Sequence, residues 1–89
     1  MADRYKVVAK VISQEGYCAH NQKVGDEWIL YGTAPSGICL NALHSIYPAS
    51  SVLELGGSFP WEDNPEITTI TCPDPKNPVV FELRRLCSE

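Results

Sequence analysis

The chain has 89 residues, including seven Lys or Arg and eleven Asp or Glu, and its formal net charge at pH 7 is −4. This length allows one domain with a modest core and excludes a second lobe. The few, scattered basic residues exclude the basic stripe that nucleic acid requires, and no apolar run approaches the roughly 20 residues of a membrane span.

The first predicted element is a strand over residues 5–13, where side chains alternate between a more apolar and a more mixed face. The chain enters this strand without the apolar segment of a signal peptide, so we expect a soluble cytoplasmic protein. A polar loop over residues 14–23 follows, and a Gly-Asp turn leads into a second strand over residues 27–31.

A helix is predicted next, starting at residue 38 or 39 and reaching residue 47. Leu40, Leu43 and Tyr47 fall at helical spacing on one stripe, which we expect to face the core. Pro48 should end or kink this helix, because proline lacks an amide donor and disfavours a helical residue before it.

The second half of the chain is rich in proline and glycine. A short segment over residues 49–55 should stop at a Gly-Gly pair, and an aromatic loop follows over residues 58–65. Strands are predicted over residues 66–72 and 79–86, joined by a linker that three prolines should make stiff and turn-like.

These elements predict a single α+β domain over residues 1–89. Along the chain the elements follow the order strand-strand-helix-strand-strand. The four strands form a small, mostly antiparallel sheet, and one kinked helix or a helical hairpin covers it. The side chains expected in the core are Val7, Val11, Trp28, Leu30, Leu40, Leu43, Leu53, Ile70, Val79, Phe81 and Leu83.

Four cysteines carry the main chemical interest of the chain. In a secreted protein they would suggest two disulfides, whereas a reducing cytosol favours metal binding or thiol chemistry. No Cys-x-x-Cys pair is present, which excludes a zinc ribbon and a thioredoxin-like motif, so the fold must assemble any site.

Cys18 and His20 lie two residues apart in the polar loop, where both could face one ion or simply be solvated.

Cys39 comes at the predicted helix start, where unpaired amides would favour its thiolate and make it a nucleophile. The alternative is a small apolar residue packed beside Leu40. His44 follows on the same helix, but five residues of helix turn its side chain roughly 140° away from that of Cys39.

His44 could therefore act as a ligand, as an acid or base, or as a partly buried histidine bonded to a backbone carbonyl.

Cys72 ends a predicted strand before Pro-Asp-Pro. This segment would hold Cys72 rigidly as a ligand, or Cys72 would be a buried core thiol. Cys87 is interpreted as incidental. An aromatic segment with two acidic residues could rim a pocket for a small polar ligand: Phe59, Trp61, Glu62 and Asp63.

An ordered set of motifs extends over nearly the whole chain: Gly25-Asp26-Glu27, Pro35-Ser36-Gly37-Ile38-Cys39, Gly56-Gly57-Ser58-Phe59-Pro60-Trp61 and Cys72-Pro73-Asp74-Pro75-Lys76-Asn77-Pro78-Val79. The set resembles a family of small prokaryotic proteins of about this length, many from anaerobes, with no assigned activity. The resemblance implies that the family's three cysteines correspond to Cys18, Cys39 and Cys72. His20 and His44 match only some members, and Cys87 matches none.

Three functions are consistent with these residues. The first is a metal-binding protein whose ligands to zinc or iron are Cys18, His20, Cys39 and Cys72, with His44 as a substitute ligand. The second is a metal-free enzyme with Cys39 as nucleophile and His44 or His20 as base. The third is an accessory protein that binds a partner through its aromatic loop. Binding of a small-molecule ligand and formation of a homo-oligomer are both compatible with the sequence.

Overall fold

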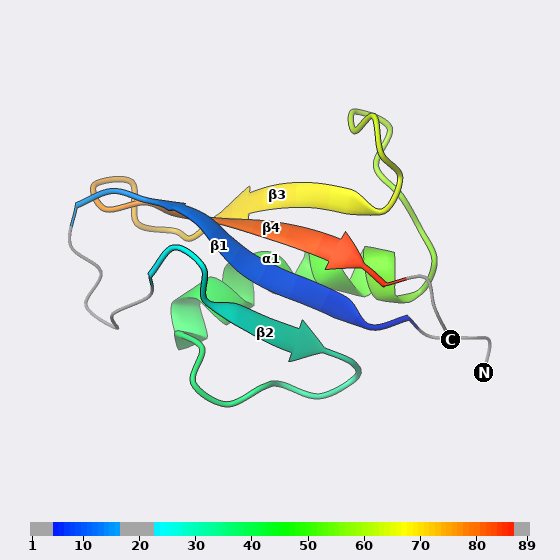
Figure 1. Cartoon of the computed structure of the whole chain (residues 1–89), viewed down its shortest axis with the longest axis horizontal. Coiled ribbons are helices and arrows are strands. Elements are labelled where there is room, and N and C mark those ends of the chain that lie inside the picture. Colours follow the sequence, from blue (N-terminus) through cyan, green and yellow to red (C-terminus); the bar gives the residue numbers. More distant parts are fainter. Residues whose placement is uncertain (1–4, 17–22, 87–89) are drawn as a thin grey trace.

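Alternation along the first and last strands produces a sheet with one buried face. The structure, a computed structural model, describes residues 5–16 and 23–86. Its elements are β1 (Val7–Gln14), β2 (Glu27–Leu30), α1 (Leu40–Glu54), β3 (Ile67–Thr71) and β4 (Val79–Arg85). The strands form one antiparallel sheet in the order β2-β1-β4-β3, and α1 lies against one face (Figure 1). The predicted α+β fold is confirmed, with a single helix.

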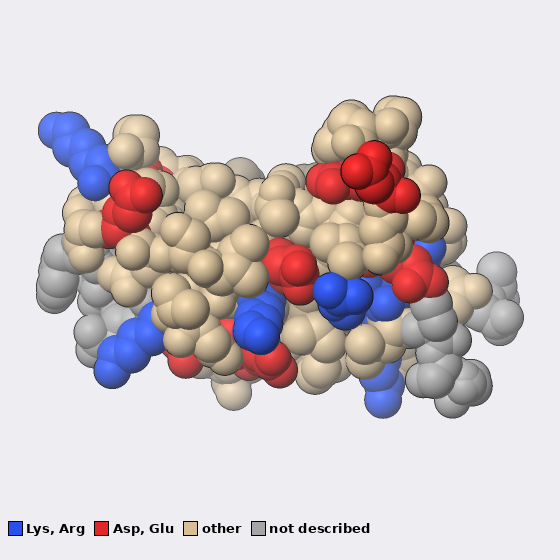
Figure 2. Space-filling view, turned by 45° about the horizontal axis from the view of Figure 1, so that its top comes forward, with Lys and Arg blue, Asp and Glu red and all other residues tan. Residues whose placement is uncertain are grey.

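The strand register decides which side chains form the core. Ala9 pairs with Leu83 of β4 and with Trp28 of β2, so all three point to the face that α1 covers. On the opposite face, Lys10 pairs with Glu27 and Glu82. Acidic and basic side chains are interspersed over the face that Figure 2 shows, so the described residues of this face present no extended field of one sign.

The helix buries a different stripe from the one that the sequence predicted. Leu40 is 77 % exposed and Tyr47 is 63 % exposed, so the expectation that they face the core was wrong. The covered positions are spaced four, three and four residues apart, as one helical face requires, and they are Ala42, Ile46, Ala49 and Leu53. Two of these are alanines, which allow the helix backbone to approach the large side chains of the sheet.

Pro48 lies inside α1 and does not end it. Proline removes one intrahelical hydrogen bond, but burial of the following turn against the sheet keeps the helix continuous. The predicted stop is confirmed, because Gly56 has φ 92° and its N–H donates to the carbonyl oxygen of Leu53. The N–H of Gly57 donates to the carbonyl oxygen of Val52, which completes a Schellman motif.

Most of the predicted core is confirmed. The buried members are Val7, Val11, Leu30, Leu53, Val79, Phe81 and Leu83, whereas Trp28, Leu43 and Ile70 are half-buried and pack against the core. No helix in the described part of the chain is long and apolar enough to cross a membrane.

Candidate functional site

Two of the predicted site cysteines lie at ends of regular elements. Cys39 is the N-cap residue of α1 and makes no side-chain capping bond, and Cys72 follows the last residue of β3. Both are free, half-buried thiols that pack against the core. Cys18, His20 and Cys87 lie outside the described residues.

The strand directions bring several of these segments to one end of the molecule. Strands β1 and β3 are both antiparallel to β4, so they end on the same side of the sheet, and α1 begins on that side (Figure 1). We call this side, with Cys39 and Cys72, the thiol end. The described residues that flank the loop of Cys18 and His20 also lie there, because that loop joins the end of β1 to the start of β2.

Cys72 belongs to a hydrogen-bonded row across the thiol end. Its N–H donates to the carbonyl oxygen of Val79 at 2.9 Å, and the N–H of Val79 donates back to the Sγ atom of Cys72 at 3.3 Å. Val79 in turn pairs with Gln14 of β1. Two strand spacings place the backbones of Cys72 and Gln14 about 10 Å apart.

The segment after β1 packs against the linker that follows Cys72. The N–H of Glu15 donates to the carbonyl oxygen of Pro78 at 3.0 Å. Gly16 has φ 71°, and a Cβ atom at this position would collide with the side chain of Asn77. This contact joins the chain just before Cys18 to the chain just after Cys72.

The linker is a fixed turn, as its prolines predicted. Asp74 Oδ1 accepts hydrogen bonds from the N–H groups of Lys76 at 3.0 Å and Asn77 at 3.2 Å, and Asp74 Oδ2 accepts one from Asn77 Nδ2 at 3.3 Å. The side-chain bond from Asn77 and the backbone bond from Lys76 lower the pKa of Asp74 below its ordinary value.

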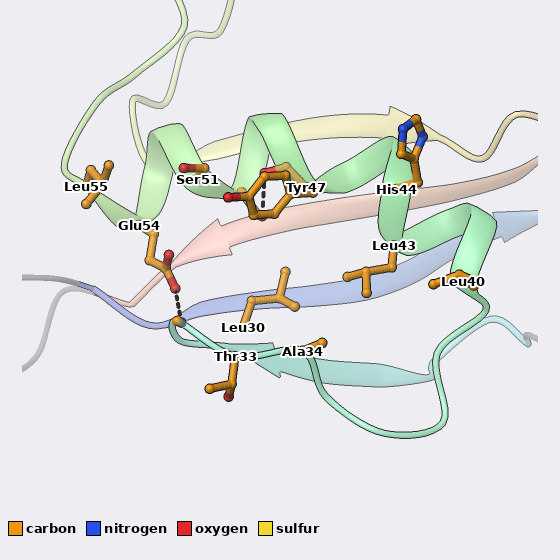
Figure 3. A pocket seen from close by; sticks show the side chains of 12 residues that line it. Leu30, Thr33, Ala34, Leu40, Leu43, His44, Tyr47, Ser51, Glu54 and Leu55 are labelled. Carbon is orange, nitrogen blue, oxygen red and sulfur yellow. Dashed lines mark hydrogen bonds between the residues drawn. The ribbon is translucent and has the colours of Figure 1, made fainter.

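A groove runs along the solvent side of α1, between the helix and residues 30–34 (Figure 3). Its volume is ≈ 570 Å³, and its apolar lining includes Leu30, Leu40, Leu43, Tyr47 and Leu55. We call it the helix groove. All three side chains of the stripe that the sequence had assigned to the core, Leu40, Leu43 and Tyr47, line this groove.

Glu54 is a functional candidate that the sequence interpretation missed. It lines the helix groove, is only 9 % exposed, and its Oε2 atom accepts a 2.6 Å hydrogen bond from the N–H of Gly32 (Figure 3). The available signal was its helical spacing from Leu43 and Tyr47, which places a carboxylate on an apolar stripe. His44 is exposed at the rim of this groove, and its imidazole points away from Leu30 at the floor.

The aromatic loop has one buried and one exposed ring. Phe59 packs against the core, and its ring centroid lies 5.0 Å from that of Trp61, which is 71 % exposed. Glu62 does not point away into solvent, because its Oε2 atom accepts a 2.8 Å hydrogen bond from Thr68 Oγ1.

Comparison of the chain with family models, curated proteins and solved structures finds no match. Within residues 5–16 and 23–86, no group of three or more His, Cys, Asp or Glu side chains could hold a metal ion. Because Cys18 and His20 fall outside those ranges, the predicted metal site stays a prediction.

Proposed function

We propose that the protein binds zinc or iron in the cytoplasm through a site at its thiol end. The proposed ligands are Cys18, His20, Cys39 and Cys72. Soft thiolate and imidazole ligands suit both metals, and four ligands would close a structural site, whereas three would leave a position for catalysis. Binding energy at such a site would add to the stability of a small domain.

The observation that carries the proposal is the packing of the segment before Cys18 against the linker after Cys72. The bond from Glu15 to Pro78 and the contact of Gly16 with Asn77 hold two cysteine-bearing segments together. Cys39 approaches the same end from the helix start. A site of this kind would need no Cys-x-x-Cys motif, because its ligands would come from three separate segments.

The hydrogen bond at Cys72 Sγ gives further support. Amide N–H groups that donate to cysteine sulfur stabilise the thiolate and orient it, which is a common outer-shell feature of thiolate metal sites. The fixed turn at Asp74 limits the movement of the linker beyond it.

Elemental analysis of protein purified without a metal-affinity tag tests the proposal. We expect close to one zinc or iron per chain in the wild type, and loss of the metal in Cys39→Ser and Cys72→Ser. Cys87→Ser is the matched control and should retain the metal. A wild-type protein that holds no zinc or iron after growth and purification in their presence contradicts the proposal.

A metal-free thiol enzyme is the second candidate, favoured by the position of Cys39 at the N-cap of α1. Nucleophilic cysteines in proteins are often found at helix N-termini. Iodoacetamide labelling as a function of pH separates the two functions. Fast labelling of Cys39 at neutral pH in metal-free protein supports the enzyme, whereas labelling that appears only after chelation supports the metal site.

A further inference from the structure

Strand β3 lies at an edge of the sheet, and no described strand pairs with its outer side (Figure 1). The carbonyl oxygen of Glu66 and the N–H of Cys72, which flank the strand, both bond to the chain of β4 and its start. Hydrogen-bonded pairs alternate along an antiparallel ladder, so the even-numbered residues of β3 bond to β4. The N–H and carbonyl groups of Thr69 and Thr71 therefore point away from the sheet, and both residues are exposed.

This edge lacks features that commonly stop a strand from pairing with another chain. Many edge strands carry charged side chains, prolines or bulges. From Ile67 to Thr71 the strand has no charge and no proline, and its register with β4 is unbroken. At the opposite edge, β2 begins with Glu27, and Lys6 Nζ lies 5.8 Å from the ring centroid of Tyr31 just beyond its end. Strand pairing is therefore less hindered at β3 than at β2.

The segments at the two ends of β3 have complementary charges. The aromatic loop before the strand carries Glu62 and Asp63, and Figure 2 shows acidic side chains gathered on this loop at its upper right. The linker after the strand carries the exposed Lys76, and the carboxylate of Asp74 beside it already accepts hydrogen bonds from within the linker. In an antiparallel pair of β3 strands, the loop of each copy comes to the linker of the other. This edge is therefore complementary to a second copy of itself.

We propose that β3 pairs with β3 of a second copy of the chain, antiparallel about a two-fold axis at Ile70. This register places Thr69 of each copy opposite Thr71 of the other, so their outward N–H and carbonyl groups form hydrogen bonds. Ile70 is half-buried on the face that α1 covers, and it meets its symmetry mate at the close spacing of a non-hydrogen-bonded pair. Because the axis is perpendicular to the sheet, both helices lie on the same face of one continuous sheet.

The strand pairing alone is too small for a stable dimer, since standard protein interfaces bury about 1,200–2,000 Å² in total. Contact between the aromatic loop and the linker supplies further area. The loop carries Trp61, which is 71 % exposed, and tryptophan is a residue type that contributes strongly to interfaces. The interface is still modest, so we expect a dimer with a dissociation constant on the order of 100 μM.

Sedimentation and amide hydrogen exchange test this proposal together. Sedimentation velocity should show a monomer at about 10 μM and mostly dimer at about 1 mM. Over this range the amides of Thr69 and Thr71 should exchange about four-fold more slowly as the dimer forms. The amides of Thr68 and Ile70 face β4, so their exchange should change less.

Thr69→Pro removes an N–H that faces away from β4, so it should leave the fold intact and abolish the dimer. Circular dichroism checks the fold of this variant. Thr69→Val is the matched control, because it keeps the N–H and suits a strand, and it should dimerise as the wild type does.

A charge exchange tests the contact of loop and linker without a proline. Lys76→Glu and Asp63→Lys should each weaken dimerisation about three- to ten-fold, because the two-fold axis repeats each contact. The double variant should restore it. Lys23→Glu, which changes the net charge as Lys76→Glu does but precedes β2 at the other edge of the sheet, should dimerise as the wild type does.

A wild type that stays monomeric up to about 1 mM overturns the proposal, and so does a folded Thr69→Pro that dimerises fully. A dimer that slows exchange at Leu40 and Tyr47 also overturns it, because the second copy would then cover the helix groove. Thr69 is not a proposed metal ligand, so Thr69→Pro should hold as much zinc or iron as the wild type. Failure of the dimer and failure of the metal site are therefore distinguishable.

Discussion

The guanidinium group of Arg85 donates a hydrogen bond from Nη1 to the carbonyl oxygen of Leu53 at 3.1 Å, across 32 residues of sequence. The same nitrogen donates to the carbonyl oxygen of Gly57 at 2.7 Å. Carbonyl groups at the end of a helix lack intrahelical partners and carry partial negative charge. The last residue of β4 therefore stabilises the end of α1 and the chain that leaves it.

Replacing Arg85 by Met should lower the free energy of unfolding by about 1.5–3 kcal/mol, because charge-assisted hydrogen bonds to two carbonyl groups are lost. Urea denaturation measures the change. Arg84→Met is the matched control, since the side chain of Arg84 is 46 % exposed and makes one ion pair with Glu82. It should change stability by about 0.5 kcal/mol or less. Equal effects of the two variants would contradict the capping role of Arg85.

Leu53 and Leu40 test which face of α1 is buried. Leu53→Ala should cost about 2–5 kcal/mol, because Leu53 is fully buried against the sheet. Leu40→Ala should cost less than about 1 kcal/mol, because its side chain is 77 % exposed. Thermal or urea denaturation of both variants measures the difference, and a larger cost at Leu40 would reverse the assignment of the faces.

Gly16 and Gly25 both have positive φ angles, 71° and 100°, but only Gly16 lies against another side chain. Gly25→Ala should cost about 1–2 kcal/mol for the backbone conformation alone. Gly16→Ala should cost more, because the added Cβ collides with Asn77. In an Asn77→Gly background the extra cost of Gly16→Ala should disappear. If it persists, the contact between these two segments is not as described.

Removing a metal from the thiol end should destabilise the protein. A ligand present at about 100 times its dissociation constant contributes about 2.7 kcal/mol to the folded state. Chelation should therefore lower the melting temperature of wild type and of Cys87→Ser, and zinc or iron should restore it. Cys39→Ser should melt low with or without chelator. A wild-type melting temperature that does not respond to chelation or to added metal argues against a stabilising site.

Local patterns in the sequence were enough to predict the strands. Alternation placed β1 and β4 within two residues of their observed bounds, because each strand has one face on the core and one in solvent. The Gly56-Gly57 stop was also predictable, since a positive φ angle at a helix end favours glycine. Both features depend on residues that are neighbours in the chain.

The helix face and the groove depend on contacts between distant residues. Helix α1 carries two apolar stripes at helical spacing, and only the position of the sheet decides that Ile46 is buried and Tyr47 is exposed. Glu54 accepts a hydrogen bond from the N–H of Gly32, which precedes it by 22 residues, so no local pattern could reveal that bond. At the thiol end, the sequence placed Cys39 at a helix start and Cys72 after a strand, but their convergence with Cys18 stays a prediction.

The central pair of the sheet joins the first strand to the last, with Val7 opposite Arg85. On a ribosome, β1 leaves the exit tunnel long before β4 is synthesised, so the middle of the sheet cannot close during most of translation. Closing so long a loop delays the native pairing and slows folding. The emerging chain would thus expose the apolar face of β1 until β4 is synthesised and pairs with it.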